Sequence, residues 1–573
     1  MTGQASLLLD QLRAARRKRT APLVLEVDLT QPLVEGVPHD PLTAALSFRK
    51  QTLRGTVDAL HRAGRDPRVR ALVAKVGGND AMGLARAQEL REAVTAFRSG
   101  GKPALAWAES FAEFGPGNGA YLLATGFDEI WLQPSGNVGL TGIAAVQLFL
   151  RGALDQVNAK ARFGQRHEYK NAVNALTESG FTEAHRESVQ AVVTAGTGQL
   201  VTRIAESRGL GADEVRALVD RGPFLAAEAL EARLVDRLGY RDEVYDEVRH
   251  RAGDDAELLF LGRYGRSGLE QLTRRVGSGS RDVIGLVHVT GGIHLGRSGG
   301  ARPLSRQSAG SDTVAAAVRA ATLTPEVRAI VLRVDSPGGS YTASDTIWRA
   351  VGRARAAGKT VVTSMGEVAA SGGYFVSMGT HAIVAEPATL TGSIGVLGGK
   401  VVLDDLVGRF GVTRDAVSSG EHALLQSSLY DYTDADRERL DAFLDHVYDD
   451  FTAKVAEGRR LSRDRAHELA RGRVWTGEDA HTHGLVDELG GLTHAIEVAK
   501  RYAGIPATVE TEVRLFPRSS PIAQLMPAQS SEDPAAHAAR VMASGWGTFA
   551  GLAAQLGLPA YGPLSLPGDW RLR

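Results

Sequence analysis

Short apolar runs rich in β-branched residues alternate along the chain with segments whose apolar residues recur at helical spacing. Residues 327–334 (VRAIVLRV) and 359–365 (KTVVTSM) are runs of the first kind, typical of strands that are buried on both faces. Residues 344–357 lie between them and carry apolar residues at the spacing of a helix. The order strand, helix, strand predicts a right-handed βαβ unit and a mainly parallel sheet. The pattern therefore predicts an α/β fold.

The chain contains this pattern twice, because it carries a long internal repeat. Residues 66–76 (DPRVRALVAKV) reappear as residues 324–334 (TPEVRAIVLRV), and residues 234–239 (LVDRLG) reappear as residues 485–490 (LVDELG). Between these segments five residues recur at one constant offset, as Tyr121 and Tyr374 illustrate (Tyr121, Gly126, Pro134, Gly139 and Gly142 in the first copy). A repeat of this length indicates a duplicated domain and not a solenoid of short units.

Composition divides the chain into four parts. The joint between the copies lies near residues 264–281, where Gly, Ser and Arg become frequent and the apolar period is lost. We expect a first domain over residues 21–270 and a second over residues 281–515. Residues 1–20 form a basic amphipathic segment, and the Ala-, Pro- and Gly-rich residues 516–573 predict a loosely structured tail.

Overall composition excludes several classes of protein. A chain of 573 residues is too long for one hydrophobic core, which supports the division into domains. The 66 Lys and Arg residues balance 66 Asp and Glu residues, so the basic bias of a nucleic-acid-binding protein is missing. Cysteine is absent, which excludes disulfides, thiolate metal sites and a cysteine nucleophile. We expect no cofactor and no metal ion.

The sequence gives no sign of a membrane span. No window holds about 18 uninterrupted apolar residues, and the apolar run Leu7–Leu9 is too short for the core of a signal peptide. We therefore expect a cytoplasmic protein. A second interpretation stays open, in which residues 7–19 form a basic amphipathic helix that contacts anionic lipid at the inner face of the membrane.

The second copy carries a serine where a predicted strand meets a predicted helix. Ser371 is flanked by Ala370, Gly372 and Gly373, and small neighbours let a substrate backbone approach closely. The free N–H groups of a new helix favour negative charge, as the attack of a serine nucleophile requires. The motif DSPGG (335–339) ends another strand and offers a second N–H donor. An ordinary tight turn would need the same residues, so the local sequence leaves both interpretations open.

Comparison of the copies favours the catalytic interpretation. Asn118 occupies the position of Ser371 in the first copy and cannot act as this kind of nucleophile. None of the 15 histidines lies in a motif typical of a Ser-His-Asp triad. A buried lysine amine can also accept a hydroxyl proton. Lys170 lies at a strand-to-helix transition of the first copy, whereas the corresponding residues 409–425 contain no lysine. This complementary loss favours one composite site; the alternative is a surface lysine.

The motifs ASGGYF (370–375), DSPGG (335–339) and TGSIG (391–395) together resemble peptidase family S49, in its long, duplicated type known as signal peptide peptidase A or protease IV. The resemblance covers roughly residues 20–515. It implies tandem ClpP/crotonase-like domains and a Ser–Lys dyad shared between them. The implied roles are nucleophile for Ser371, general base for Lys170, amine-holding hydroxyl for Ser393, and oxyanion donors for Gly372 and Gly339.

The resemblance also implies peptide substrates, such as remnant signal peptides, and a homo-oligomer, which is a tetramer in the duplicated type. The small residues around Ser371 and the apolar Val396–Leu397 predict a groove for extended apolar peptides, bound by strand addition to a sheet edge. Two other functions stay open. One is a crotonase-type acyl-CoA hydratase or isomerase, which shares the glycine-turn oxyanion hole, and the other is a non-catalytic oligomeric scaffold.

Overall fold

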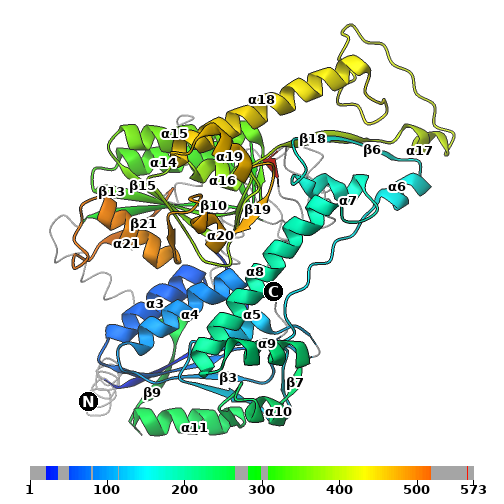
Figure 1. The fold of residues 1–573 in the computed structure, drawn as a ribbon. Coiled ribbons are helices and arrows are strands. Elements are labelled where there is room, and N and C mark those ends of the chain that lie inside the picture. Colours follow the sequence, from blue (N-terminus) through cyan, green and yellow to red (C-terminus); the bar gives the residue numbers. More distant parts are fainter. Residues whose placement is uncertain are drawn as a thin grey trace, which may run out of the picture.

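The computed structural model describes residues 21–35, 51–78, 82–113, 115–253, 255–264, 282–298, 307–517 and 564–565. The predicted amphipathic segment 1–20, most of the predicted joint between the copies and most of the predicted tail lie outside these residues. Within the described part the chain forms two α/β units stacked on each other, with the second copy above the first in Figure 1. The predicted α/β fold is confirmed.

The first copy is built on a six-stranded parallel sheet in the order β8-β4-β3-β2-β1-β9. Its strands are β1 (Leu23–Asp28), β2 (Val69–Lys75), β3 (Ala104–Ala108), β4 (Glu129–Leu132), β8 (Arg237–Leu238) and β9 (Glu257–Phe260). Successive side chains point to opposite faces, so Leu23 and Leu25 pack on one side of the sheet while Val24 packs on the other. Helices cover both faces, as a parallel sheet requires.

One face of the first sheet packs against α3 (Leu53–Arg65), α4 (Leu84–Arg98), α5 (Asn118–Ala124) and α8 (Glu183–Arg208). The other face packs against α11 (Arg241–Ala252). The small helices α9 (Ala212–Arg221) and α10 (Ala226–Glu231) and the pair β5 (Asn137–Val138) and β7 (Phe224–Leu225) complete this copy.

The second copy repeats the order of the first sheet as β20-β16-β15-β13-β10-β21. These strands are β10 (Val283–Thr290), β13 (Val327–Ser336), β15 (Thr360–Ala370), β16 (Ala382–Ala385), β20 (Glu488–Leu489) and β21 (Glu512–Phe516). The carboxyl-terminal half of β15 pairs instead with β17 (Leu390–Gly392), which pairs antiparallel with β19 (Val474–Thr476). The predicted strands at 327–334 and 359–365 are confirmed as β13 and β15, and the shared strand order supports the duplication.

Helices again cover both faces of the second sheet. One face packs against α14 (Ser311–Leu323), α15 (Tyr341–Ala356) and α16 (Gly372–Ser377), together with α18 (Asp434–Arg459) and α19 (Arg463–Leu469). The other packs against α21 (Leu492–Tyr502), and α20 (Gly477–Thr482) follows β19. The predicted helix at 344–357 is α15, which begins three residues earlier because Ser340 accepts a hydrogen bond from Ala343 N and caps it.

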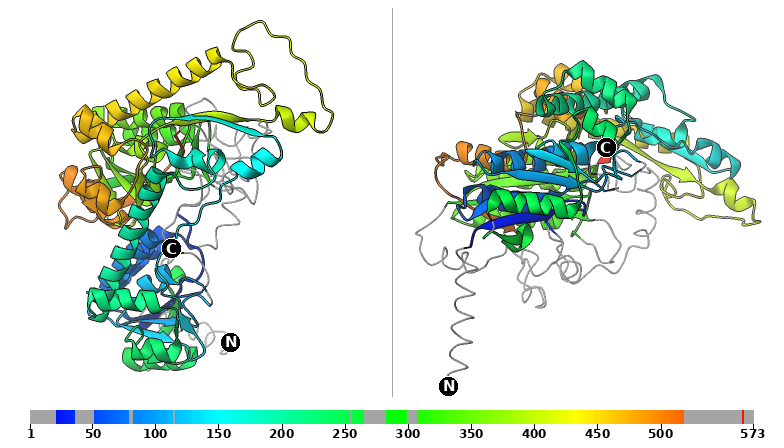
Figure 2. Two further views of the ribbon diagram at one scale, coloured as in Figure 1. Left: turned by 45° about the vertical axis from the view of Figure 1, so that its right-hand side comes forward. Right: turned by 90° about the horizontal axis from the view of Figure 1, so that it is seen from below.

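Segments of the two copies pair with each other in an arm, which we define as residues 151–177 and 397–431. In it β6 (Lys160–Gln165) of the first copy pairs antiparallel with β18 (Leu397–Val402) of the second. Ion pairs between Lys160 and Asp405 (2.6 Å) and between Arg162 and Asp431 (2.9 Å) accompany this ladder. The arm, which includes α6 (Arg151–Gln156) and α17 (Asp404–Gly408), projects away from both sheets in Figures 1 and 2.

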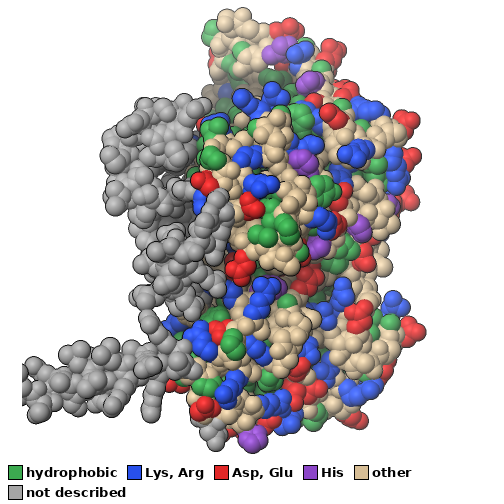
Figure 3. All heavy atoms as spheres, turned by 90° about the vertical axis from the view of Figure 1, so that its left-hand side faces the viewer, with side chains coloured by type: hydrophobic (Ala, Val, Ile, Leu, Met, Phe, Trp, Pro, Cys, Tyr) green, Lys and Arg blue, Asp and Glu red, His purple; other side chains and the backbone are tan. Residues whose placement is uncertain are grey.

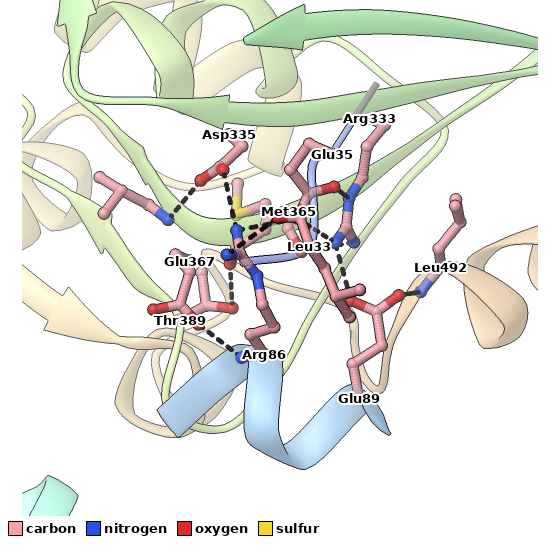
Figure 4. A network of polar contacts seen from close by, with 12 residues as sticks. Leu33, Glu35, Arg86, Glu89, Arg333, Asp335, Met365, Glu367, Thr389 and Leu492 are labelled. Carbon is pink, nitrogen blue, oxygen red and sulfur yellow. Dashed lines mark hydrogen bonds and ion pairs between the residues drawn. The ribbon is translucent and has the colours of Figure 1, made fainter. Parts of the chain in front are cut away.

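A buried ion-pair network joins the copies at their interface (Figure 4). Arg333 on β13 is 1% exposed, and its guanidinium contacts Glu89 of α4 at 2.7 Å and Glu35, which follows β1, at 3.2 Å. Burial alone would raise the pKa of Glu35, but the charges of Arg333 and Arg86 lower it to about 2. The second Glu89 oxygen accepts a hydrogen bond from Leu492 N at the start of α21. Arg333 of the second copy therefore pairs with two buried carboxylates of the first copy, one of which also contacts Arg86 of its own copy.

Charged side chains of both signs are interspersed over the face shown in Figure 3, in keeping with the balanced composition. Among the helices of the described ranges, none has the combination of length and hydropathy that would let it cross a bilayer.

Candidate active site

Ser371 lies at the predicted junction between a strand and a helix. Strand β15 ends at Ala370 and α16 begins at Gly372, so Ser371 is the cap between them and is fully buried. Its backbone has φ 56° and ψ −112°, a conformation that costs a non-glycine residue about 1–3 kcal/mol and is found chiefly at functional sites. Two backbone hydrogen bonds hold it there, from Ser371 N to Gly392 O and from Phe375 N to Ser371 O.

Lys170 of the first copy reaches Ser371 of the second. The Lys170 Nζ atom lies 2.8 Å from Ser371 Oγ, 2.9 Å from Ser393 O and 3.0 Å from Ser393 Oγ. The side chain is 1% exposed, and its described polar neighbours are hydroxyl and carbonyl oxygens without negative charge. Burial without a compensating carboxylate lowers the pKa of Lys170 to about 7. The alternative of a surface lysine is wrong for this position.

The backbone around Lys170 is fixed by both copies. Lys170 lies between β6, which is held by β18, and the short helix η1 (Asn171–Val173) that leads into α7 (Asn174–Thr177). Tyr169 N donates to Arg471 O at 3.1 Å, and Gly472 N donates to Ile394 O at 2.8 Å. The loop after α19 therefore bridges the lysine segment and the TGSIG segment.

Gly472 is a residue of this site that sequence reasoning missed. It has φ +87°, and a Cβ added there would collide with the backbone of Lys170, 2.5 Å from its Cα atom. Only a residue without a side chain lets the loop pass this close. A glycine between two arginines carries no recognisable motif. The residue that it contacts, Lys170, lies 302 residues earlier in the chain. No local signal in the sequence could have revealed it.

Ser393 also has a positive φ, of 50°, and is held by a hydrogen bond from its N–H to Arg473 O at 2.7 Å. It is 1% exposed. This backbone conformation turns both its hydroxyl and its carbonyl oxygen toward Lys170 Nζ, so one residue supplies two of the three oxygens around the amine.

The backbone N–H groups of Gly372 and Gly339 lie beside Ser371. A Cβ added to Gly372 would be 3.0 Å from Gly339 N, so the two glycines approach each other directly. Gly338 and Gly339 form the short strand β14, with positive φ values of 95° and 156°. Ser336 holds the turn, since its Oγ donates to Gly291 O and accepts from Gly338 N. The structure therefore brings all five predicted site residues together.

The inter-copy network extends to the strands that carry these motifs. Asp335, at the start of DSPGG, accepts a hydrogen bond from Val368 N at 3.2 Å and faces the guanidinium of Arg86 at 3.9 Å. The backbone N–H of Arg86 donates to Glu367 Oε1 (Figure 4). Helix α4 of the first copy thus contacts the ends of β13 and β15, from which the glycine turn and Ser371 emerge.

Comparison with known proteins identifies the family. The model of peptidase family S49 matches residues 96–254 and 353–505, one segment in each copy. The chain is 30% identical to the chloroplastic serine protease SPPA of Arabidopsis thaliana over 81% of this chain and 67% of the relative. It is also 30% identical to Protease 4 of Salmonella typhi, over 80% of this chain and 73% of the relative. The chain belongs to peptidase family S49.

The two matched segments and the long relatives assign this S49 peptidase to the duplicated type, as predicted. The family consists of serine proteases, so the alternative of an acyl-CoA hydratase or isomerase is set aside. Among solved structures, the chain resembles the membrane-bound stomatin-specific protease 1510-N in complex with a substrate peptide, with a TM-score of 0.26 and 16% identity. That match covers 42% of this chain and 94% of the other.

In the first copy of this S49 peptidase, the residue that corresponds to Ser371 is Asn118, and its side chain stabilises the local fold. Asn118 begins α5, and its Nδ2 donates to Gly142 O at 2.8 Å while its Oδ1 accepts from Thr141 N at 3.2 Å. Both partners belong to the segment that corresponds to TGSIG in the second copy. The amide therefore fastens the helix to this loop, where the second copy has the serine and the lysine amine.

Proposed function

We propose that this protein is a serine endopeptidase in which Ser371 is the nucleophile and Lys170 is the general base. The observation that carries the proposal is the 2.8 Å distance between Lys170 Nζ and Ser371 Oγ in a buried site without a compensating carboxylate. Under this proposal the lysine domain is residues 21–270 and the serine domain is residues 281–515. The composite site explains why the first copy retains its fold although Asn118 replaces the nucleophile.

The chemistry requires a neutral amine. With a pKa of about 7, a substantial fraction of Lys170 is unprotonated at neutral pH, and its lone pair can accept the Ser371 hydroxyl proton. The two N–H bonds of the neutral amine can then be directed at the carbonyl and hydroxyl oxygens of Ser393. Ser393 thereby orients the lone pair toward Ser371. The ammonium formed on proton transfer returns the proton to the leaving amine.

The developing negative oxygen would be received by the N–H groups of Gly372 and Gly339. Gly372 is the first residue of α16 and Gly339 belongs to the fixed turn of β14, so both donors are positioned before substrate arrives. Loss of one such donor in an oxyanion hole costs about 10²–10³ in kcat. Ser371 and these two groups are the parts that acyl transfer needs.

We propose extended, apolar peptides as substrates, such as remnant signal peptides or unfolded hydrophobic segments. A relative of this chain is described as a putative signal peptide peptidase SppA, from Enterococcus faecium. The small residues beside Ser371 favour an extended peptide that binds by strand addition to a sheet edge.

We also infer a homo-oligomer, a tetramer on the family pattern, that works in the cytoplasm with peripheral contact to the inner face of the membrane. Apolar side chains on and beside the arm are more than half exposed and support self-association (Val146, Leu148, Phe410, Val412 and Val417). The basic segment 1–20 of the sequence supports the membrane contact.

Labelling with a fluorophosphonate tests the function. We expect one label per chain, on Ser371, and we expect the chain to cleave unstructured apolar peptides. Both the label and the cleavage should disappear in Ser371→Ala. Ser377→Ala is a matched control, because Ser377 is also buried on α16. Among the described contacts, its hydroxyl and carbonyl groups bond only to Gly373 and Thr380 of its own segment. Failure of the wild-type chain to label or to cleave any peptide would contradict the proposal and favour the scaffold alternative.

A further inference from the structure

The loop that follows α19, residues 470–473, covers Lys170. A Cβ added to Gly395 would lie 3.0 Å from the Cα atom of Gly472 and 3.3 Å from the Cδ atom of Lys170. The loop and the lysine side chain are therefore packed together against the TGSIG segment. Because burial is what lowers the pKa of Lys170 to about 7, the proposed chemistry depends on this loop staying closed.

The backbone of the loop needs support from other segments. Arg471 has φ 56° and Gly472 has φ +87°, so two successive residues adopt the left-handed conformation, which is unfavourable for arginine. Arg471 O accepts a hydrogen bond from Tyr169 N at 3.1 Å, and Arg473 O accepts one from Ser393 N at 2.7 Å. These bonds hold two carbonyl groups of the loop but do not hold the N–H group of Arg471.

Tyr448 of α18 holds this N–H group. The Tyr448 hydroxyl oxygen accepts a hydrogen bond from Arg471 N at 3.3 Å and lies 2.9 Å from Nδ1 of His467 on α19. Burial raises the pKa of Tyr448 to about 12, so the hydroxyl keeps its proton at neutral pH. The hydroxyl can therefore donate this proton to an unprotonated Nδ1 of His467 while its oxygen accepts from Arg471.

The ring of Tyr448 contacts the segment that carries the lysine. Its centroid lies 4.6 Å from the centroid of the His167 ring, and His167 O accepts a hydrogen bond from Lys170 N at 3.4 Å. The tyrosine is 6% exposed and belongs to the hydrophobic core of the second copy, so it is a rigid support. One side chain thus contacts both the lysine segment and the loop that covers it.

The charged groups of the loop are paired with glutamates of the first copy. Arg471 pairs with Glu168, and Arg473 Nη1 lies 3.0 Å from Glu187. The pKa of Lys170 is lowered by burial, as described above, and the polar partners of its amine are uncharged oxygens. The state of the amine is therefore governed by the exclusion of water, which the loop provides.

We propose that Tyr448 is a positioning residue for the general base, whose hydroxyl holds residues 470–473 closed over Lys170. The inference rests on the function proposed above and adds to it a residue that acts through Arg471 and not on Ser371. Without the hydroxyl, the Arg471 N–H group loses this acceptor and takes water in its place, beside the amine. A hydrated amine has a pKa nearer that of an ordinary lysine, so a smaller fraction of it is neutral at a given pH.

Tyr448→Phe tests the inference, because it removes the hydroxyl and keeps the ring. The pKa of Lys170 is measured without reference to activity: the full-length chain is acetylated with acetic anhydride from pH 5 to pH 10, and modified Lys170 is quantified by mass spectrometry. We expect a midpoint near pH 7 in the wild type and one about 1 pH unit higher in Tyr448→Phe.

Peptide cleavage by the same variant gives a second readout. A pKa that is higher by about one unit leaves about tenfold less neutral amine at pH 6, so kcat/KM should fall about tenfold there and approach the wild-type value above pH 9. The loss should lie in kcat and not in KM, because the hydroxyl acts on the base. A structural role alone would lower the rate by the same factor at every pH.

Tyr121→Phe is the matched control. Tyr121 is fully buried in the first copy, and its hydroxyl donates to Leu234 O at 2.7 Å. This variant therefore also loses one buried hydrogen bond of a tyrosine, but in the other copy. Its acetylation midpoint and its pH profile should match those of the wild type.

The outcomes separate this inference from the proposed function. A wild-type midpoint in Tyr448→Phe, an equal shift in Tyr121→Phe, or a loss of rate that is the same at every pH overturns the role of Tyr448. If Tyr448→Phe does not fold, His467→Phe decides in its place, because it removes the acceptor of the hydroxyl proton and should raise the midpoint in the same direction. A wild-type chain that cleaves no peptide contradicts the proposed function, and the acetylation midpoints then decide by themselves whether Tyr448 keeps the amine dry.

Discussion

The turn at Ser371 and the turn at Asn118 follow equivalent strands of two sheets with the same order, yet the side chains of these two residues make different polar contacts. Ser371 has a positive φ and a hydroxyl that contacts a buried amine. Asn118 is a regular first residue of α5, and its amide bonds to Thr141 N and Gly142 O. The strained turn is the one we propose as catalytic, and the relaxed turn is the one that stabilises its own copy.

Under the proposed function, the first copy is still needed because it supplies Lys170. Lys170 belongs to the first copy by sequence, but it is positioned by β18, Gly472 and Ser393 of the second copy. Under the proposed function, one copy can lack the nucleophile and the other the lysine because the arm joins them. On that proposal the unit of function is the pair of copies.

The largest effect is expected from Lys170→Arg. A guanidinium stays protonated and cannot accept the Ser371 proton, so kcat/KM for peptide cleavage should fall by about 10³-fold or more. Lys75→Arg is the matched control, because Lys75 forms a half-exposed pair with Glu109 in the first copy. Peptidase assays on both variants check this, and near-wild-type activity in Lys170→Arg would rule out the lysine as the base.

The interface between the copies is tested by Arg333→Met. This substitution leaves Glu35 and Glu89 buried without their shared cation and should lower the free energy of unfolding by about 3–5 kcal/mol. Arg203→Met, which breaks the exposed pair with Glu206, should cost about 1 kcal/mol or less. Urea denaturation of both variants measures the difference, and equal small losses would show that the network does not hold the copies together.

The state of the amine is tested by the pH profile. Under the proposed mechanism Lys170 works as the neutral amine. Because burial lowers its pKa to about 7, kcat/KM should then rise about tenfold per pH unit below 7 and level off above it. The steady-state rate is measured from pH 5 to pH 9. A rate that keeps rising to pH 9 would mean a lysine with an ordinary pKa, and one that falls with pH would mean a different base.

The smallest effect is expected from Asn118→Ser, which introduces a serine at the position of the first copy that corresponds to Ser371. It should produce no second labelling site, because the described contacts of that turn contain no amine. It should also lower the free energy of unfolding by about 1 kcal/mol through the lost bonds to Thr141 and Gly142. Mass spectrometry after fluorophosphonate labelling counts the sites, and two labels per chain would show that the first copy needs only a serine.

The parts of this molecule that were predictable are those carried by local patterns or by the repeat. Apolar runs predict β13 and β15, and the comparison of the copies selects Ser371 and Lys170 from ordinary serines and lysines. Gly472 and the pairing of Arg333 with Glu35 were not predictable, because each depends on a tertiary contact between segments without a motif. Pairing of Leu564 with Gly339 is of the same kind, since two residues of a biased tail carry no strand period.

The central claim is that one chain assembles the dyad from both of its copies, and complementation between two inactive chains tests it most directly. Full-length Ser371→Ala and Lys170→Ala are unfolded together, refolded together in a series of ratios, and assayed for peptide cleavage. Since Lys170 Nζ lies 2.8 Å from Ser371 Oγ of the same chain, every mixture should stay inactive. Recovery of a fraction of wild-type turnover in the mixtures would contradict the account, because the lysine of one chain would then be serving the serine of another.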